Sequence, residues 1–141
     1  MSFTNYLEHA TLDYLFGATA FTPSGTLYVG LSTTTPGEDA SSFTEPAGAS
    51  GYARAAIPNV KASTSGWSSA AQLSTSGEIH NQGTISFGTA SGNWGTITHA
   101  GIWNSLAGGN LLTQSALALQ KTPTSGDVVT FPSGAISIRL D

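Results

Sequence analysis

Cysteine is absent from this chain of 141 residues, and charged side chains are scarce. Without cysteine the protein has no disulfides, no thiolate metal ligands and no cysteine nucleophile. Only four residues are basic against eight acidic ones, and the basic residues form no run, so the positive surface that nucleic-acid binding requires is lacking. No apolar run approaches about 18 residues, and the N-terminus has no signal-peptide pattern. We therefore expect no nucleic-acid partner, no membrane partner and synthesis in a cytoplasm.

Serine, threonine and glycine take the place of the missing charge. The chain has 19 serines, 19 threonines and 17 glycines. This composition is typical of short strands that are joined by polar turns. The net charge of −4 is too small for a disordered chain. The length predicts a single domain over residues 1–141.

The beginning of the chain carries the one helical pattern. Apolar residues recur there at helical spacing; they are Phe3, Leu7, Ala10 and Tyr14, with Leu12, Leu15 and Phe16 widening the stripe. Ser2 or Thr4 suits the N-cap position, and Gly17 suits the position after the last turn. The pattern predicts a helix over residues 4–16. We expect it to cover a sheet, and the alternative is that it docks onto a partner.

After Gly17 the apolar period changes to two. The alternation of Leu27, Val29 and Leu31 predicts a half-buried strand over residues 26–32. Further strands are expected at 52–57, 78–80, 84–87, 96–103, 111–112, 116–120, 128–131 and 135–140, of which 111–112 and 116–120 are either two strands or one bent strand. Two loops rich in serine, threonine and glycine, at 33–51 and 59–77, interrupt the series. The pattern predicts a mainly β fold, an antiparallel β-sandwich with a jelly roll as its expected topology and one short N-terminal α-helix.

No residues have the spacing of a catalytic or metal site. The histidines, which are His9, His80 and His99, are far apart and match no zinc-binding spacing. A catalytic serine would be expected in a G-x-S-x-G turn, and none is present. Three clustered acids, Glu38, Asp39 and Glu45, could bind Ca²⁺, but they fit no EF-hand loop, so a solvated loop is favoured. We expect no enzymatic activity, no catalytic residue, no bound metal and no cofactor.

The three tryptophans allow two interpretations. Trp67, Trp94 and Trp103 could line a sugar-binding platform among the glycine-rich turns. In a small β protein such residues are more often part of the core or its rim. The core interpretation is therefore favoured, and a carbohydrate-binding module is the third function considered.

Several segments together resemble a family of small virion proteins of tailed phages. They are residues 1–8 (MSFTNYLE), 26–36 (TLYVGLSTTTP), 45–46 (EP), 51–54 (GYAR), 94–103 (WGTITHAGIW), 108–112 (GGNLL) and 134–141 (GAISIRLD). The resemblance covers nearly the whole chain except residues 59–77. Members of the family are often labelled tail-fibre proteins, and in length and composition the chain also looks like phage capsid cement proteins, which are small jelly rolls. The shared motifs are structural and imply no catalytic residue.

The resemblance implies a structural role in a virion. The first expectation is a capsid cement protein, which binds the major capsid protein on the capsid exterior and bridges its subunits to stabilise the DNA-filled head. The alternative is a tail-fibre or receptor-binding protein. A subunit that bridges neighbours is expected to self-associate, most simply as a two-fold dimer. The candidate interface residues are Phe3, Leu7, Phe43 and Trp67, because large apolar groups in a helix or in polar loops are natural interface anchors.

Overall fold

The structure is a computed structural model that describes residues 1–69 and 77–140. Its elements are β1 (Ser2–Phe3), α1 (Asn5–Phe16), β2 (Thr26–Ser32), the 3-10 helix η1 (Gly48–Ser50), β3 (Ala55–Pro58), β4 (Gly77–His80), β5 (Ile85–Ser86), β6 (Ile97–Trp103), β7 (Leu111–Lys121), β8 (Thr130–Phe131) and β9 (Ser137–Leu140). The fold is mainly β with one α-helix near the N-terminus, as the sequence predicted. All ladders between these strands are antiparallel.

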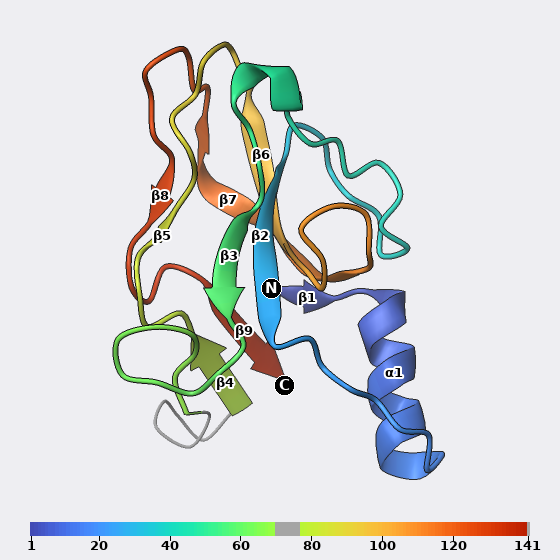
Figure 1. The fold of residues 1–141 in the computed structure, drawn as a ribbon. Coiled ribbons are helices and arrows are strands. Elements are labelled where there is room, and N and C mark those ends of the chain that lie inside the picture. Colours follow the sequence, from blue (N-terminus) through green and yellow to red (C-terminus); the bar gives the residue numbers. More distant parts are fainter. Residues whose placement is uncertain (70–76, 141) are drawn as a thin grey trace.

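A five-stranded sheet with the strand order β1-β7-β6-β2-β3 forms the main layer (Figure 1). The short ladders β4–β9 and β5–β8 lie beside it. The core is built from both groups of strands. Leu31 and Ile97 of the sheet belong to the same apolar cluster as Ile85 of β5 and Ile136 before β9. This arrangement is that of an antiparallel sandwich, and the jelly-roll topology stays a prediction.

Most strand positions agree with the apolar alternation of the sequence. β2 has the predicted bounds, and residues 111–121 form one strand rather than two. The sequence did not reveal β1, which pairs Ser2 with Gln114 and Phe3 with Thr113. A two-residue strand is too short for an alternation pattern, and its partner is more than a hundred residues away. The predicted loop at 33–51 is present, with η1 near its end. The loop expected at 59–77 is described only for residues 59–69 and 77.

Helix α1 does not cover the sheet, so that expectation is wrong. None of its residues is buried, although Leu7 packs against the edge of the core. Figure 1 shows the helix beside the sheet, with its C-terminal end directed away from the strands. The reason lies in the helical period. Phe16 follows Leu7 by nine residues, which is about two and a half turns and puts the two on opposite sides.

With 12 residues, this helix is also too short to cross a membrane, and the described residues contain no helix that could.

Thr4 precedes α1 at the predicted N-cap position, but it does not cap the helix with its side chain. Its hydroxyl is buried and donates instead to the backbone oxygens of Leu111 and Leu112, at 2.6 Å and 3.1 Å. The Thr4 N–H also donates to the oxygen of Leu112, at 2.9 Å. The start of the helix is therefore anchored to β7 rather than stabilised from within.

Candidate functional site

Two glycines create a bare patch on the outer face of the main sheet. Gly30 of β2 and Gly101 of β6 are directly paired. A Cβ atom on Gly30 would lie 2.9 Å from Nε1 of Trp103, and one on Gly101 would lie 2.8 Å from Cε2 of Phe43. Only glycine leaves room for this close approach. The rings of Phe43 and Trp103 meet edge to face above the patch, with their centroids 5.2 Å apart. Loop 33–51 is thereby held against the sheet.

Arg54 joins this outer cluster to two loops. Its Nε and Nη2 donate to the two carboxylate oxygens of Glu45, at 2.9 Å and 2.7 Å. Its Nη1 donates to the backbone oxygens of Ser105 and Gly108, at 2.7 Å and 2.8 Å. The Arg54 side chain is only 5% exposed, and bidentate, charge-assisted bonds of this kind are strong and directional. Arg54 therefore fixes loop 33–51 and the turn around residues 104–110 to each other.

Tyr52 completes the network around Glu45. Its hydroxyl donates to Oε1 of Glu45 at 2.7 Å and accepts a hydrogen bond from the Leu31 N–H at 2.8 Å. Burial raises the pKa of Tyr52, so the phenol keeps its proton well above the usual range. The hydrogen bonds of Tyr52, Arg54 and Glu45 described here are all made to groups of this chain. We interpret the network as a structural clamp.

The histidines do not meet. His9 lies exposed on α1, His80 lies in β4, and His99 lies in β6 with its Nδ1 2.8 Å from Oγ1 of Thr98. Across residues 1–69 and 77–140, no group of three or more histidine, aspartate and glutamate side chains could hold a metal ion. The structure thus provides no zinc-like arrangement in the part of the chain that it describes.

The three clustered acids separate into two environments. Glu45 pairs with Arg54, whereas Glu38 and Asp39 are exposed. Hydrogen bonds from the side chain and backbone of Ser41 lower the pKa of Asp39. The solvated-loop interpretation therefore holds for Glu38 and Asp39. It is wrong for Glu45, because the cation that Glu45 binds is the guanidinium of Arg54.

The four candidate interface residues are not exposed anchors. Trp67 is only 4% exposed and belongs to the core, because backbone bridges to Lys61 and Asn81 fold its loop inward. Phe43 is half-buried against Trp103, and Phe3 and Leu7 are half-buried near β7. Trp67 is therefore not available at the surface of the single chain. A role of Phe3, Leu7, Phe43 and Trp67 at an interface stays a prediction.

The tryptophans do not form a surface platform. Trp94 and Trp103 are buried like Trp67. Trp94 packs edge-on against Tyr52 and donates from Nε1 to the backbone oxygen of Ser50, at 2.8 Å. The core interpretation of these residues is confirmed, and the sugar-platform interpretation is wrong.

The outer face of α1 is the most exposed apolar surface of the helix. We define it by Leu15 and Phe16, which are 62% and 84% exposed. Leu12 and Tyr14 are also exposed, but Leu12 lines a hollow beside β9. The charged residues of α1 are acidic, namely Glu8 and Asp13, and the helix has no lysine or arginine. The prediction that Leu12, Leu15 and Phe16 widen the Leu7 stripe is therefore wrong, because spacings of five and nine residues put Leu12 and Phe16 on a different side of the helix from Leu7.

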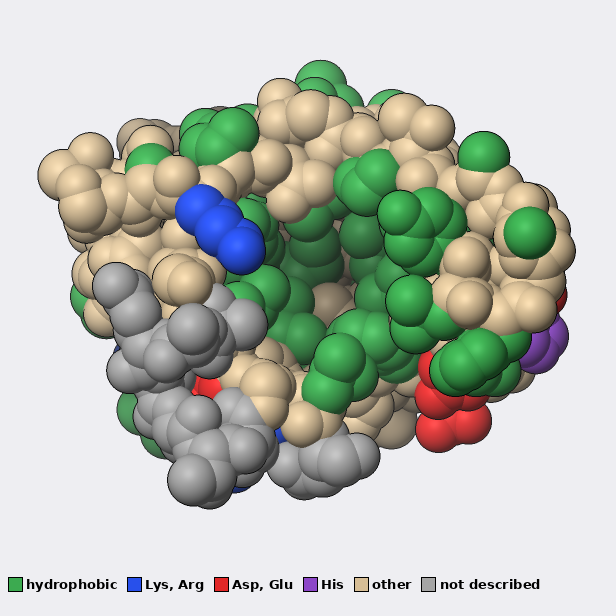
Figure 2. Space-filling model, turned by 90° about the horizontal axis from the view of Figure 1, so that it is seen from below, with side chains coloured by type: hydrophobic (Ala, Val, Ile, Leu, Met, Phe, Trp, Pro, Cys, Tyr) green, Lys and Arg blue, Asp and Glu red, His purple; other side chains and the backbone are tan. Residues whose placement is uncertain are grey.

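A groove runs along β7. It lies between residues 115–121 of β7 and the segment 127–137, and its volume is about 700 Å³. Its apolar lining residues are Met1, Leu117, Val129, Phe131 and Ile136, together with the more exposed Leu119 and Val128. Figure 2 shows a hollow lined mainly by hydrophobic side chains, with a basic side chain at its rim. We call this feature the β7 groove.

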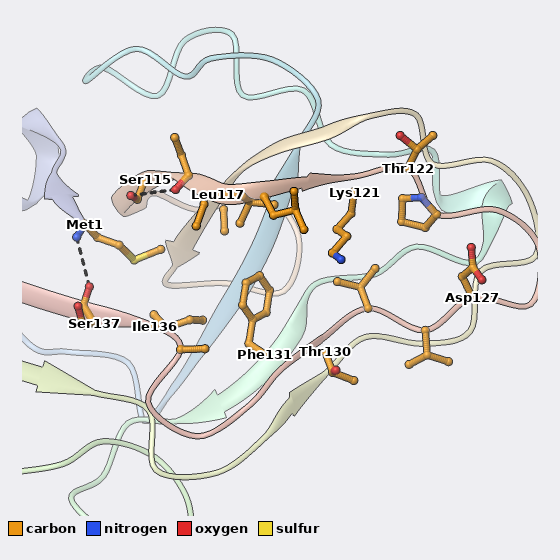
Figure 3. A pocket seen from close by; sticks show the side chains of 18 residues that line it. Met1, Ser115, Leu117, Lys121, Thr122, Asp127, Thr130, Phe131, Ile136 and Ser137 are labelled. Carbon is orange, nitrogen blue, oxygen red and sulfur yellow. Dashed lines mark hydrogen bonds between the residues drawn. The ribbon is translucent and has the colours of Figure 1, made fainter.

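Residues from both walls of the β7 groove face each other across it, and a hydrogen bond joins its two sides at one end. The N-terminal amino group of Met1 donates to the backbone oxygen of Ser137 across one end, at 3.2 Å. Lys121 and Phe131 point into the groove from opposite walls (Figure 3). Beyond this end the groove continues into a second hollow of about 940 Å³ beside α1 and β9, because both are lined by Met1, Ser115 and Ala116. No sequence pattern predicted this groove, because its walls come from segments that are separated in the chain.

Comparison with known proteins identifies the family. No curated protein matches the chain. A family model described as "Podophage GP4 fiber I protein gp80" matches residues 2–139, which is nearly the whole chain. This match agrees with the resemblance to small tailed-phage virion proteins that the sequence motifs carry. The protein therefore belongs to the podophage GP4 fiber I protein gp80 family of phage virion proteins.

Proposed function

We propose that this protein is a structural subunit of a podophage fibre. The observation that carries the proposal is the family match over residues 2–139, whose description is that of a fibre protein. The match covers the sheet, the clamp around Arg54 and the helix together, so it concerns the fold as a whole and not one shared motif.

The surface of the chain supports a role in an assembly. The outer face of α1 and the β7 groove are both apolar and open in the single chain. Monomeric proteins rarely leave such surfaces uncovered, and when they do, the surfaces are usually binding sites. Subunits of a fibre would cover them in the assembled particle. The polar network of Tyr52, Arg54 and Glu45 is bonded within the chain, which fits a structural role without catalysis.

A capsid cement protein is the second candidate. The described residues contain no shaft-like element, since their longest strand has 11 residues and their helix has 12. A cement subunit needs no shaft, because it binds the outer surface of a preformed shell and bridges copies of the major capsid protein. The net negative charge also suits a position away from the packaged DNA.

Electron microscopy of virions labelled with an antibody against this chain separates the two candidates. The fibre proposal expects label at the tail, and label over the whole head would support cement. Heating particles that lack the protein provides a second measurement. The fibre proposal expects unchanged heat resistance of DNA-filled heads together with lost adsorption to the host. Reduced heat resistance with normal adsorption would reject it in favour of cement.

A further inference from the structure

We propose that copies of this protein associate head to tail, with the outer face of α1 on one copy seated in the β7 groove of the next. Phe16 and Leu15 are the anchors of this contact, and Leu117, Val129 and Phe131 form the floor that receives them. The proposal does not rest on where the protein sits in the virion, because it concerns a contact between two copies of the isolated chain.

Shape is the first argument. The end of α1 is convex, apolar and directed away from the body of the protein, whereas the β7 groove is concave and apolar (Figures 1 and 2). A helix laid with its apolar face in such a groove is a common mode of protein recognition. Phe16 is the most exposed of the large hydrophobic residues in the part of the chain that the structure describes.

The available area is the second argument. A large aromatic side chain covers about 150–250 Å², so the exposed parts of Leu15 and Phe16 together offer roughly 300 Å². A standard interface buries about 800 Å² on each partner. The end of the helix therefore supplies more than a third of such an interface, and the apolar residues of the groove add to it. Within residues 1–69 and 77–140, the Phe16 side chain stays 84% exposed.

Charge is the third argument, and it favours a second copy as the occupant. The helix carries Asp13 beside its outer face and has no basic residue. The groove carries two charged residues, Lys121 and Asp127. The carboxylate of Asp127 already accepts hydrogen bonds from the N–H and hydroxyl of Thr124. Among the described residues neither Asp13 nor Lys121 takes part in an ion pair. Lys121 of the groove and Asp13 of the helix thus have opposite charges and could pair across the contact.

The two surfaces lie too far apart for one pair of copies to make the contact twice, as a two-fold dimer would require. Figure 1 places the C-terminal end of α1 and strand β8, which lines the groove, on opposite sides of the molecule. A contact between different patches repeats from copy to copy and produces a ring or a filament. The assembly expected here therefore differs from the two-fold dimer that the sequence analysis favoured.

Cross-linking between single-cysteine variants tests the contact, because the natural chain has no cysteine. We would prepare the full chain as Thr19→Cys beside the end of α1, Leu119→Cys and, as a control, Leu106→Cys, all at exposed positions, with Leu106 on the distant turn at 104–110. Under mild oxidation, a mixture of Thr19→Cys and Leu119→Cys should form mixed dimers at least about tenfold faster than either variant mixed with the control. Dimers formed chiefly by Thr19→Cys with itself would overturn the proposal in favour of helix-to-helix pairing. Equal rates in all mixtures would overturn it altogether.

A charge exchange gives an independent test. Asp13→Lys and Lys121→Glu should each shift sedimentation of the full chain toward the monomer, and the combined variant should restore the assembly of the natural protein. Restoration is the result that a merely structural defect would not give. A combined variant that dissociates as much as the single variants would overturn the pairing of α1 with the groove. Failure of either test would leave the position in the virion untouched, because antibody labelling measures that separately.

Discussion

The guanidinium of Arg54 stacks on the indole of Trp103, with its Cζ atom 3.7 Å from the ring centroid. Arg54 directly precedes β3, and Trp103 is the last residue of β6. The two side chains meet above the bare patch that Gly30 and Gly101 leave on the sheet. A cation on the face of an indole is attracted by the ring, and the attraction grows when water is excluded. This stacking orients the guanidinium so that Glu45 and the turn at 104–110 can both be bound.

Arg54→Ala should lower the free energy of unfolding by about 3 kcal/mol, because it leaves the Glu45 carboxylate without its buried partner. Arg54→Lys should recover only part of this loss, since an ammonium group cannot bind the carboxylate at two points or stack in the same way. Denaturant unfolding followed by tryptophan fluorescence measures both. Arg139→Ala is the matched control, because it removes the exposed ion pair with Glu78 and should have a much smaller effect. Equal losses at Arg54 and Arg139 would contradict the clamp.

Gly101→Ala should destabilise the protein by about 1–3 kcal/mol through overpacking. The new methyl group would lie 2.6 Å from Cδ1 of Leu111 and 2.8 Å from Cε2 of Phe43, so both side chains would have to move. Thermal unfolding of the variant measures the loss. Gly25→Ala is the control, since no atom lies within 4 Å of a Cβ at that position. A stability of Gly101→Ala that equals that of Gly25→Ala would show that the patch tolerates a side chain.

Tyr52 should make the protein less stable in alkaline solution. Because burial raises its pKa, the folded state holds the phenolic proton more tightly than the unfolded state does. The stabilisation is complete below the ordinary tyrosine pKa of about 10 and decreases as the pH rises above it. The difference between the phenolate absorbance of the natural protein and that of Tyr52→Phe reports this residue alone. We expect this absorbance difference to appear only at pH values above the ordinary tyrosine pKa. A midpoint near the pKa of free tyrosine would contradict burial of the phenol.

Thr4→Val should lower the free energy of unfolding by about 1–3 kcal/mol, because it leaves the carbonyl oxygens of Leu111 and Leu112 without the hydroxyl that binds them. Thr4→Ser keeps the hydroxyl and should lose much less. Chemical denaturation of the two variants gives the comparison. Hydrogen exchange should show the added loss of protection in β1 and α1 first, since Thr4 connects both to β7. A loss in Thr4→Ser as large as that in Thr4→Val would contradict the dominant role of the hydroxyl, because serine keeps the hydroxyl and lacks only the methyl group.

Local pattern was enough to locate most elements of this fold, with β1 as the exception. The alternation of Leu27, Val29 and Leu31 defined β2, and the helical spacing near the N-terminus together with Thr4 and Gly17 defined α1. Both signals arise within a few residues, because each reflects which side of one element is apolar. The same period places Phe16 opposite Leu7, so counting Phe16 in the apolar stripe was wrong, and the structure leaves it exposed.

Tertiary structure alone decided which residues meet. Nothing local indicates that Arg54 lies on Trp103, that Glu45 binds Arg54 rather than a metal ion, or that Trp67 turns inward to the core. These outcomes depend on which strands become neighbours and on two paired glycines that leave room on the sheet. The β7 groove likewise exists only because residues 115–121 and 127–137 face each other after folding. The sequence by itself determined the elements and their apolar sides, and the pairing of distant strands decided the clamp, the groove and the surface that is open to a partner.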